Sequence, residues 1–275
     1  MDQGFLKDRF QGKTMIVTGF ATGIGRETAI RAAQEGAKLV LADRKVQESR
    51  DTHEEIRQLG GEAQFLVIDL TDSVNVKRMV DLAVTTYGGL DIAINNAGVM
   101  GKPSPVHLLD EKDLTETMNN NFMSVFYCCR EELRVLVAQG RGGVIVNNAS
   151  IAGLVGLPGN AAYVASKHAV NGLTRNMALD YAKYQIRINS VNPAGTDTPM
   201  VEEAMAFVKA SLDTALKAGV DPAEAQGMAG QKTQNLQKRN AKAREQAASI
   251  LYLASDDAAH ITGTLFATDG GWTSF

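Results

Sequence analysis

Apolar and β-branched residues occur in short runs along the chain, and polar segments with helical spacing separate most of these runs. A short apolar run between turn residues is typical of a strand that is buried on both faces. The runs that predict strands cover residues 13–18, 37–43, 63–69, 90–98, 142–150, 186–193 and 261–271. The segments that predict helices cover residues 26–35, 46–59, 111–138 and 163–183, and a further helix ends at about residue 87. This alternation predicts βαβ units and a parallel sheet with helices on both faces.

The alternation continues along the chain without internal repeats or low-complexity tracts. We therefore expect residues 1–275 to form a single domain, and a chain of this length buries a substantial core.

The segment 196–245 departs from the alternation and predicts a helical insertion between the sixth and seventh strands. Its apolar stripe, which is spaced for one face of a helix, consists of Val201, Met205, Val208, Leu212 and Leu216. A second helix is expected to start at Asp221, with Pro222 at its first position and Glu224 in its first turn. The insertion follows the carboxyl end of a strand, where open α/β sheets bind ligands. We favour a substrate lid over a pair of packing helices.

A glycine-rich turn follows the first strand and begins a helix. Its sequence is Thr18-Gly19-Phe20-Ala21-Thr22-Gly23-Ile24-Gly25. Glycines allow the backbone to turn tightly and to approach a pyrophosphate, whose charge is favoured at a helix N-terminus. The strand before the turn and the helix after it support a nucleotide site, although the glycine spacing is GxxxGxG rather than GxGxxG.

Asp43 ends the second strand, where a carboxylate can accept hydrogen bonds from both ribose hydroxyls and repel a 2′-phosphate. The neighbouring Arg44 could instead hold such a phosphate. Asp43 itself and the uncharged Thr22 favour NAD over NADP. Asp69, which ends the third strand, is a candidate for contact with the adenine amine. Asn96-Ala97-Gly98 ends the fourth strand and permits close approach of the backbone to a cofactor.

Ser150, Tyr163 and Lys167 form the candidate chemical site. Tyr163 follows Ser150 by thirteen residues, and Lys167 follows Tyr163 by four, which is one helical turn. Taken alone, the pattern is also compatible with neighbours on a helix surface.

Composition narrows the possible partners. Of the 275 residues, 44% are hydrophobic and 21% are charged, and the net charge is −3, which favours a soluble protein that does not bind nucleic acid. We expect no membrane span, because no apolar run approaches eighteen residues, and a cytoplasmic location, because the N-terminus lacks a signal-peptide core. The adjacent Cys128 and Cys129 suit a reducing compartment. The four histidines have no metal-ligand spacing, so we expect no metal site.

From about Lys13 to Gly271 the chain resembles the short-chain dehydrogenase/reductase family, in its branch of single-domain members. The resemblance rests on the glycine turn, on Asn96-Ala97-Gly98, and on the spacing of Ser150, Tyr163 and Lys167. It implies a Rossmann-type, doubly wound, parallel seven-stranded sheet. The implied catalytic residues are Asn121, Ser150, Tyr163 and Lys167. The implied cofactor-binding residues are Gly19, Thr22, Gly23, Ile24, Gly25, Asp43, Arg44, Asp69, Leu70, Asn96, Ala97, Gly98, Tyr163, Lys167, Pro193, Gly195, Thr196 and Thr198.

One position departs from the family. The chain has Pro193-Ala194-Gly195 where the family usually has Pro-Gly, and this difference concerns the loop near the nicotinamide rather than the reaction.

The resemblance implies an NAD(H)-dependent oxidoreductase that interconverts a secondary alcohol and a ketone, with Tyr163 as general acid and base. A free tyrosine has a pKa of about 10. An ammonium about 4 Å away contributes on the order of 4 kcal/mol at an effective dielectric constant of 20, or roughly three pKa units, and Lys167 is spaced to provide it. Ser150 would hold the substrate oxygen, and Asn121 would support a water chain that carries the proton to solvent.

Alternatives remain at this point. One is an NADP-dependent carbonyl reductase. Another is a non-catalytic nucleotide-binding scaffold or sensor, which would not need four catalytic residues. A reductase of carbon–carbon double bonds is disfavoured, because such relatives typically have a longer gap between tyrosine and lysine.

The expected partner is a small-molecule alcohol or ketone, and the resemblance implies a homotetramer. The residues that suggest an apolar pocket for a ring or sterol-like compound are Met100, Leu154, Leu157, Met200 and Met205.

Overall fold

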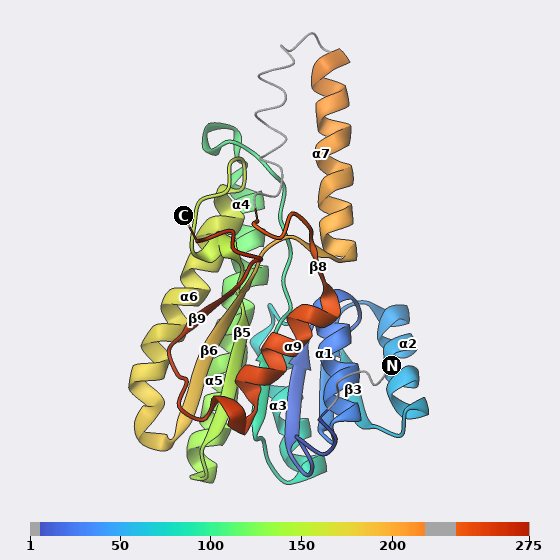
Figure 1. Cartoon of the computed structure of the whole chain (residues 1–275), viewed down its shortest axis with the longest axis vertical. Helices are drawn as coiled ribbons and strands as arrows, with labels where there is room; N and C mark the ends of the chain where they lie inside the picture. Colours follow the sequence, from blue (N-terminus) through green and yellow to red (C-terminus); the bar gives the residue numbers. More distant parts are fainter. Residues whose placement is uncertain (1–5, 218–234, 275) are drawn as a thin grey trace.

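A computed structural model describes residues 6–217 and 235–274 of the chain. Its central element is a sheet of seven parallel strands in the order β3-β2-β1-β4-β5-β6-β9 (Figure 1). The strands are β1 (Thr14–Thr18), β2 (Lys38–Asp43), β3 (Glu62–Val67), β4 (Ile92–Asn95), β5 (Gly143–Asn148), β6 (Ile186–Pro193) and β9 (Leu265–Thr268). The order changes direction between β1 and β4, and open α/β sheets bind ligands beside such a point. The predicted fold class is therefore confirmed.

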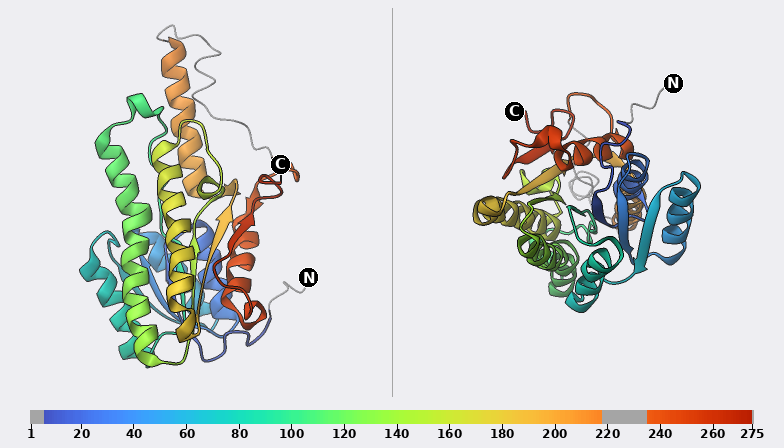
Figure 2. Two further views of the ribbon diagram at one scale, coloured as in Figure 1. Left: turned by 90° about the vertical axis from the view of Figure 1, so that its left-hand side faces the viewer. Right: turned by 90° about the horizontal axis from the view of Figure 1, so that it is seen from below.

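Helices cover both faces of this sheet (Figures 1 and 2). The long helices are α1 (Gly23–Gln34), α2 (Val46–Gln58), α3 (Ser73–Tyr87), α4 (Glu111–Met118), α5 (Ser124–Gln139), α6 (Ala161–Tyr181), α7 (Pro199–Lys217) and α9 (Ala243–Ala254). The short 3₁₀ turns are η1 (Val106–Leu108), η3 (Ile151–Gly153), η4 (Ala182–Tyr184) and η5 (Asp256–Ala258). Helices α3, α5 and α6 pack on one core, and α1 and α9 pack on another.

The strand residues alternate between these two cores. Ile16 packs with the α3, α5 and α6 side, whereas its neighbours Met15 and Val17 pack with the α1 and α9 side. Because both faces are covered, both sets of side chains must be apolar, which explains the continuous apolar run in β1.

The structure corrects two predicted elements and adds a helix that was not predicted. The helix expected over residues 111–138 consists of α4, a π-helical turn, η2 (Asn119–Met123), and α5. The last strand spans Leu265–Thr268 rather than 261–271, because the chain turns at Gly263 and Gly270, which have φ angles of 72° and 63°. Helix α9 has no predicted counterpart. It begins at Ala243, inside the segment 196–245 that was expected to form the insertion, and its Ile250 and Leu251 are fully buried in the core of the domain.

The insertion between β6 and β9 starts from a two-stranded parallel pair, β7 (Thr196–Asp197) and β8 (Ala241–Lys242). Helix α7 follows β7 and projects beyond the body of the molecule (Figure 1). The second helix expected at Asp221 lies outside the described residues. No helix in the described part of the chain is long and apolar enough to cross a membrane.

Candidate active site

A cavity of about 690 Å³ opens at the carboxyl ends of the strands. The predicted site residues that line it are Gly19, Thr22, Gly23, Ile24, Asp43, Arg44, Asp69, Leu70, Asn96, Ala97, Gly98, Ser150, Tyr163, Lys167, Pro193, Gly195, Thr196 and Thr198. The fold thus brings together residues that are distant in the sequence. Gly25 and Asn121 do not line the cavity, and their contacts are described below.

The glycine turn packs tightly against the end of β4. Gly19 has a φ angle of 67°, and a Cβ atom there would lie 2.8 Å from the Cα atom of Ala97. Gly25 packs still more closely, since its Cβ would lie 2.0 Å from the Gly19 carbonyl oxygen. Gly25 therefore brings α1 close to the turn, and a side chain at either glycine would push the two segments apart.

Asparagine side chains fasten this turn to its neighbours. Asn96 Nδ2 donates to the backbone carbonyls of Thr18 and Gly19 at 3.0 and 3.1 Å. Asn148, at the end of β5, donates to Asn96 Oδ1 at 2.8 Å. The side chain of Thr22 does not cap α1, so N–H groups of the first turn remain available to an anion such as a pyrophosphate. These residues fit a dinucleotide.

Asp43, the predicted ribose contact, ends β2 and lines the cavity. Its Oδ2 accepts a hydrogen bond from Ala21 N and its Oδ1 accepts one from Lys45 N, both at 3.0 Å. The exposed Arg44 donates to Asn120 Oδ1 at 3.5 Å. Asp43 is thus held rigidly against the glycine turn, whereas Arg44 extends toward the π-helical turn. Asp69 is exposed, and its Oδ1 accepts hydrogen bonds from the backbone and hydroxyl of Thr71 at 2.8 Å.

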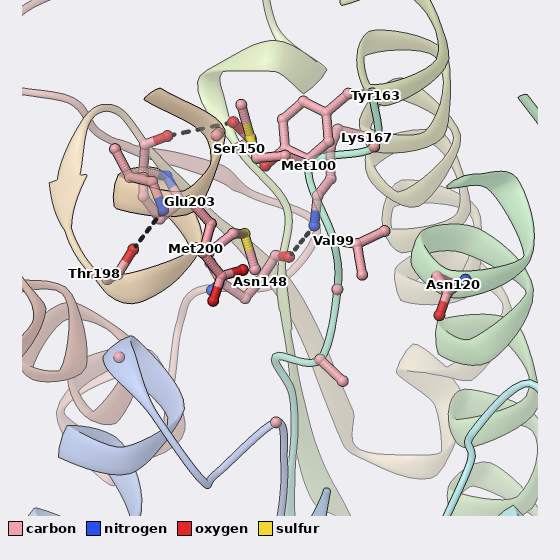
Figure 3. A pocket seen from close by; sticks show the side chains of 18 of the residues that line it. Val99, Met100, Asn120, Asn148, Ser150, Tyr163, Lys167, Thr198, Met200 and Glu203 are labelled. Atoms are coloured by element: carbon pink, nitrogen blue, oxygen red, sulfur yellow. Dashed lines mark hydrogen bonds between the residues drawn. The ribbon is translucent and has the colours of Figure 1, made fainter. Parts of the chain in front are cut away.

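Ser150, Tyr163 and Lys167 are all buried at the cavity. Ser150 Oγ donates to the Pro193 carbonyl at 3.5 Å, accepts from Ala152 N at 3.1 Å and lies close to the Tyr163 side chain (Figure 3). Lys167 Nζ donates to the backbone carbonyl of Asn148 at 3.0 Å and lies 5.6 Å from the centre of the Tyr163 ring. Figure 3 shows Ser150 and Tyr163 close together and the Lys167–Asn148 hydrogen bond beneath them. A hydroxyl pair with an adjacent amine can bind an alcohol oxygen and transfer a proton.

Burial changes the expected electrostatics of this group. It raises the pKa of Tyr163, and the nearby Ser150 hydroxyl opposes that rise. Burial also lowers the pKa of Lys167 to about 8. In the protein alone, desolvation by burial therefore dominates, and the net shift of the Tyr163 pKa is upward. That Lys167 lowers the pKa of Tyr163 in the working enzyme stays a prediction.

Asn121 is fully buried in the π-helical turn. Its Nδ2 donates to the Val99 carbonyl at 2.9 Å and to Ser166 Oγ at 3.0 Å, and its Oδ1 accepts from Val99 N at 2.7 Å. Both amide donors are thus used within the protein, and the side chain clamps the segment after β4 onto α6. Its neighbour Asn120 faces the cavity instead.

A second buried amide, Asn171, lies one turn beyond Lys167 and was not predicted from the sequence. Its Nδ2 donates to the Gly153 carbonyl at 2.9 Å and to Asn192 Oδ1 at 2.7 Å, and its Oδ1 accepts from Ser190 Oγ at 2.7 Å. These bonds hold the turn that begins at Ser150 against β6. Asn171 follows Lys167 by four residues, and this helical spacing was the feature of the sequence that could have indicated it.

The remaining wall of the cavity is largely apolar. The residues of the expected apolar set that line it are Met100, Leu157, Met200 and Met205, whereas Leu154 does not. Phe207 on α7 and Trp272, which follows β9, also line it and were not predicted. Trp272 had no pattern to mark it. The described residues contain no cluster of potential metal ligands.

Comparison with known proteins agrees with this geometry. The family model described as short chain dehydrogenase matches residues 13–209. The chain is 44% identical to 3beta-hydroxysteroid dehydrogenase of Mediterraneibacter gnavus, with 99% of each chain covered. It is 35% identical to cyclohexanol dehydrogenase of an Acinetobacter species, with 98% of each chain covered. Among solved structures, levodione reductase superposes with a TM-score of 0.86 at 33% identity, covering 96% of this chain and 99% of that one.

Proposed function

Because the chain belongs to the short-chain dehydrogenase family, whose oxidoreductases use NAD or NADP, we propose that it interconverts a secondary alcohol and a ketone with NAD(H). Tyr163 is the general acid and base in this proposal. The observation that carries it is the burial of Ser150, Tyr163 and Lys167 together in the cavity that also contains the glycine turn.

The cofactor would be held by the glycine turn, the first turn of α1, Asp43 and the end of β4. When bound, it supplies the acceptor or donor of the hydride. Lys167 lies 3.5 Å from the position of a Cβ at Gly98, so its amine borders the backbone along which a nicotinamide ribose would lie. The same lysine can then bind ribose hydroxyls and act on Tyr163.

In oxidation, the Tyr163 oxygen accepts the proton of the substrate hydroxyl, and in reduction it returns that proton. Ser150 binds the substrate oxygen, and its hydroxyl, which lowers the pKa of Tyr163, would stabilise the tyrosinate. Burial disfavours the tyrosinate, so a positive charge beside it must offset part of this cost. Lys167, when protonated, provides that charge.

Asp43 supports NAD over NADP. Its carboxylate is fixed by two backbone N–H groups at the ribose position, where it would repel a 2′-phosphate. Arg44 favours the opposite choice, but its side chain extends toward Asn120. We therefore infer a preference for NAD.

The apolar wall supports a substrate whose hydroxyl group lies on an alicyclic ring. Methionine side chains from two segments, at Met100 and Met200, border the candidate chemical site, and α7 adds Met205 and Phe207. Two relatives, a 3beta-hydroxysteroid dehydrogenase and a cyclohexanol dehydrogenase, are named for alcohols of this class. We propose that α7 is the substrate lid.

The test is nicotinamide absorbance with purified protein, NAD and a panel that includes cyclohexanol, a 3β-hydroxysteroid and straight-chain secondary alcohols. We expect NADH formation with the cyclic alcohols and faster reaction with NAD than with NADP. Binding of NAD without turnover of any alcohol or ketone on the panel would instead support a nucleotide-binding scaffold.

A further inference from the structure

We propose that Trp272 determines which alcohols fit the cavity by contacting the far end of a fused-ring substrate, and that Asp269 is the residue that positions it. This inference rests on the proposed function and concerns the same cavity. Trp272 is partly exposed and lines the cavity together with Tyr163, Met200 and Phe207.

Asp269 holds the turn that carries the indole. The residue is 8% exposed, its Oδ1 accepts from Gly271 N at 2.9 Å, and its Oδ2 accepts from Thr273 N at 2.8 Å and Thr273 Oγ1 at 2.6 Å. Its backbone carbonyl accepts from Trp272 N at 3.3 Å. Burial raises the pKa of Asp269, but these hydrogen bonds outweigh it and the net pKa is lowered. The carboxylate is therefore charged near neutral pH and fixes the residues on both sides of Trp272.

The segment of the insertion that precedes β8 contacts the same turn. Gln237 N donates to the Gly270 carbonyl at 3.2 Å. Gly271 has a φ angle of 87°, and a Cβ atom there would lie 2.7 Å from Leu236 Cδ1. The turn is thus held on one side by Asp269 and on the other by Leu236, so the backbone that carries the indole is fixed at the wall.

The sheet sets the separation between this wall and the chemical site. Ser150 follows β5 and Trp272 follows β9, and β6 lies between these two strands. Two strand spacings amount to about 10 Å. A single six-membered ring with its hydroxyl group on Ser150 does not cover this distance, whereas a fused-ring alcohol does. The flat face of an indole suits such a rigid apolar ring system.

Steady-state kinetics with a 3β-hydroxysteroid and with cyclohexanol test the inference. We expect Trp272→Leu to raise the KM for the steroid roughly tenfold and to leave kcat and the constants for cyclohexanol within about twofold. Trp272→Phe should restore most of the loss. Asp269→Asn should act in the same direction as Trp272→Leu. The matched control is Tyr184→Leu, an aromatic replacement outside the cavity, which should change neither substrate. Equal effects of Trp272→Leu on both alcohols, or no effect, overturn the proposal.

Fluorescence separates this inference from the proposed function. The chain contains one tryptophan, so its intrinsic emission reports on Trp272 alone. In the presence of NAD, the steroid should shift the emission and cyclohexanol should not. A steroid-dependent shift without turnover supports the wall and rejects the dehydrogenase activity. Steroid turnover without any shift rejects the wall and keeps the activity.

Discussion

Lys167 donates from Nζ to the backbone carbonyl of Asn148, and this neutral partner lies 3.0 Å away. A carbonyl dipole orients the amine without supplying the full negative charge that would offset its burial. The pKa of Lys167 is consequently lowered to about 8, and Lys167 changes protonation within the pH range of ordinary assays. The charge beside Tyr163 is therefore adjustable, and a bound cofactor can alter it.

Tyr163→Phe removes the hydroxyl that exchanges the proton and keeps the ring. We expect turnover to fall by about 10³-fold or more, because the hydroxyl that transfers the proton is lost. The dissociation constant of NADH, measured by fluorescence titration, should change by less than about threefold. Such a change corresponds to less free energy than the loss of one hydrogen bond. Tyr181→Phe is the control, since Tyr181 lies on the same helix but does not line the cavity. Turnover close to that of the wild type would reject Tyr163 as the acid and base.

Ser150→Ala should shift the pH profile of alcohol oxidation. Oxidation requires the deprotonated tyrosine, so its rate rises with pH through the pKa of Tyr163. The Ser150 hydroxyl lowers that pKa, and its loss therefore moves the midpoint of kcat/KM to higher pH as well as reducing the rate. Ser150→Thr, which retains a hydroxyl, should keep the midpoint. An unchanged midpoint in Ser150→Ala would show that the Ser150 hydroxyl does not act on the titrating group.

Asp43→Asn should relax the choice of cofactor. The amide can still accept from Ala21 N, but the charge that opposes a 2′-phosphate is gone. We expect the ratio of kcat/KM for NADP to that for NAD to rise roughly tenfold, which corresponds to about 1.4 kcal/mol. Asp51→Asn, on the exposed face of α2, is the control. If the ratio does not rise, Asp43 does not select the cofactor.

Glu132 predicts a separate effect of pH on stability. Its side chain is fully buried on α5, Asn95 Nδ2 donates to its Oε2 at 3.0 Å, and burial raises its pKa from 4.5 to about 8. At pH values between 4.5 and about 8, Glu132 binds a proton in the folded state and releases it in the unfolded state. Its contribution to stability is therefore complete below pH 4.5 and is lost as the pH rises through about 8.

Glu132→Gln should remove this loss, because the amide stays neutral. At pH 8.5 the variant should be more stable than the wild type by on the order of 1 kcal/mol, measured as the free energy of unfolding in urea. The difference should shrink as the pH falls toward 5. Glu116→Gln, which replaces an exposed glutamate, should follow the wild type. A difference that does not depend on pH would contradict the assignment.

Much of the fold could be predicted from the sequence because both faces of the sheet are buried. In a chain with alternating helices, a continuous apolar run such as the one at β1 indicates a strand that is covered on both sides. The π-helical turn at Asn121 could not be predicted, since its cause is tertiary: the asparagine pairs with Val99, which follows β4, and with Ser166 from α6. Helix α9 was missed because a short alanine-rich helix has a weak apolar pattern and is fixed by its contact with the sheet.

Some features of the candidate site could likewise be predicted from the sequence, and others depend on the tertiary structure. The glycine turn and the Ser150, Tyr163 and Lys167 spacing are local patterns, so the sequence reveals them. The pKa shifts depend on burial, which no spacing reports. Trp272 enters the cavity only because β9 pairs with β6, and its place at the wall therefore required the structure.

The β7–β8 pair has a consequence for engineering. Thr196 pairs with Ala241, and Ala241 N also donates to the Gly195 carbonyl at 2.9 Å, so the insertion leaves the body and returns to it at one place. The entropic cost of closing a loop between fixed ends rises only slowly with its length, by about 0.6 kcal/mol for each doubling. The segment that follows Thr198 and precedes Asn235 can therefore be treated as exchangeable. Grafts of different length between these two positions should leave the cofactor-binding residues and the Trp272 turn intact.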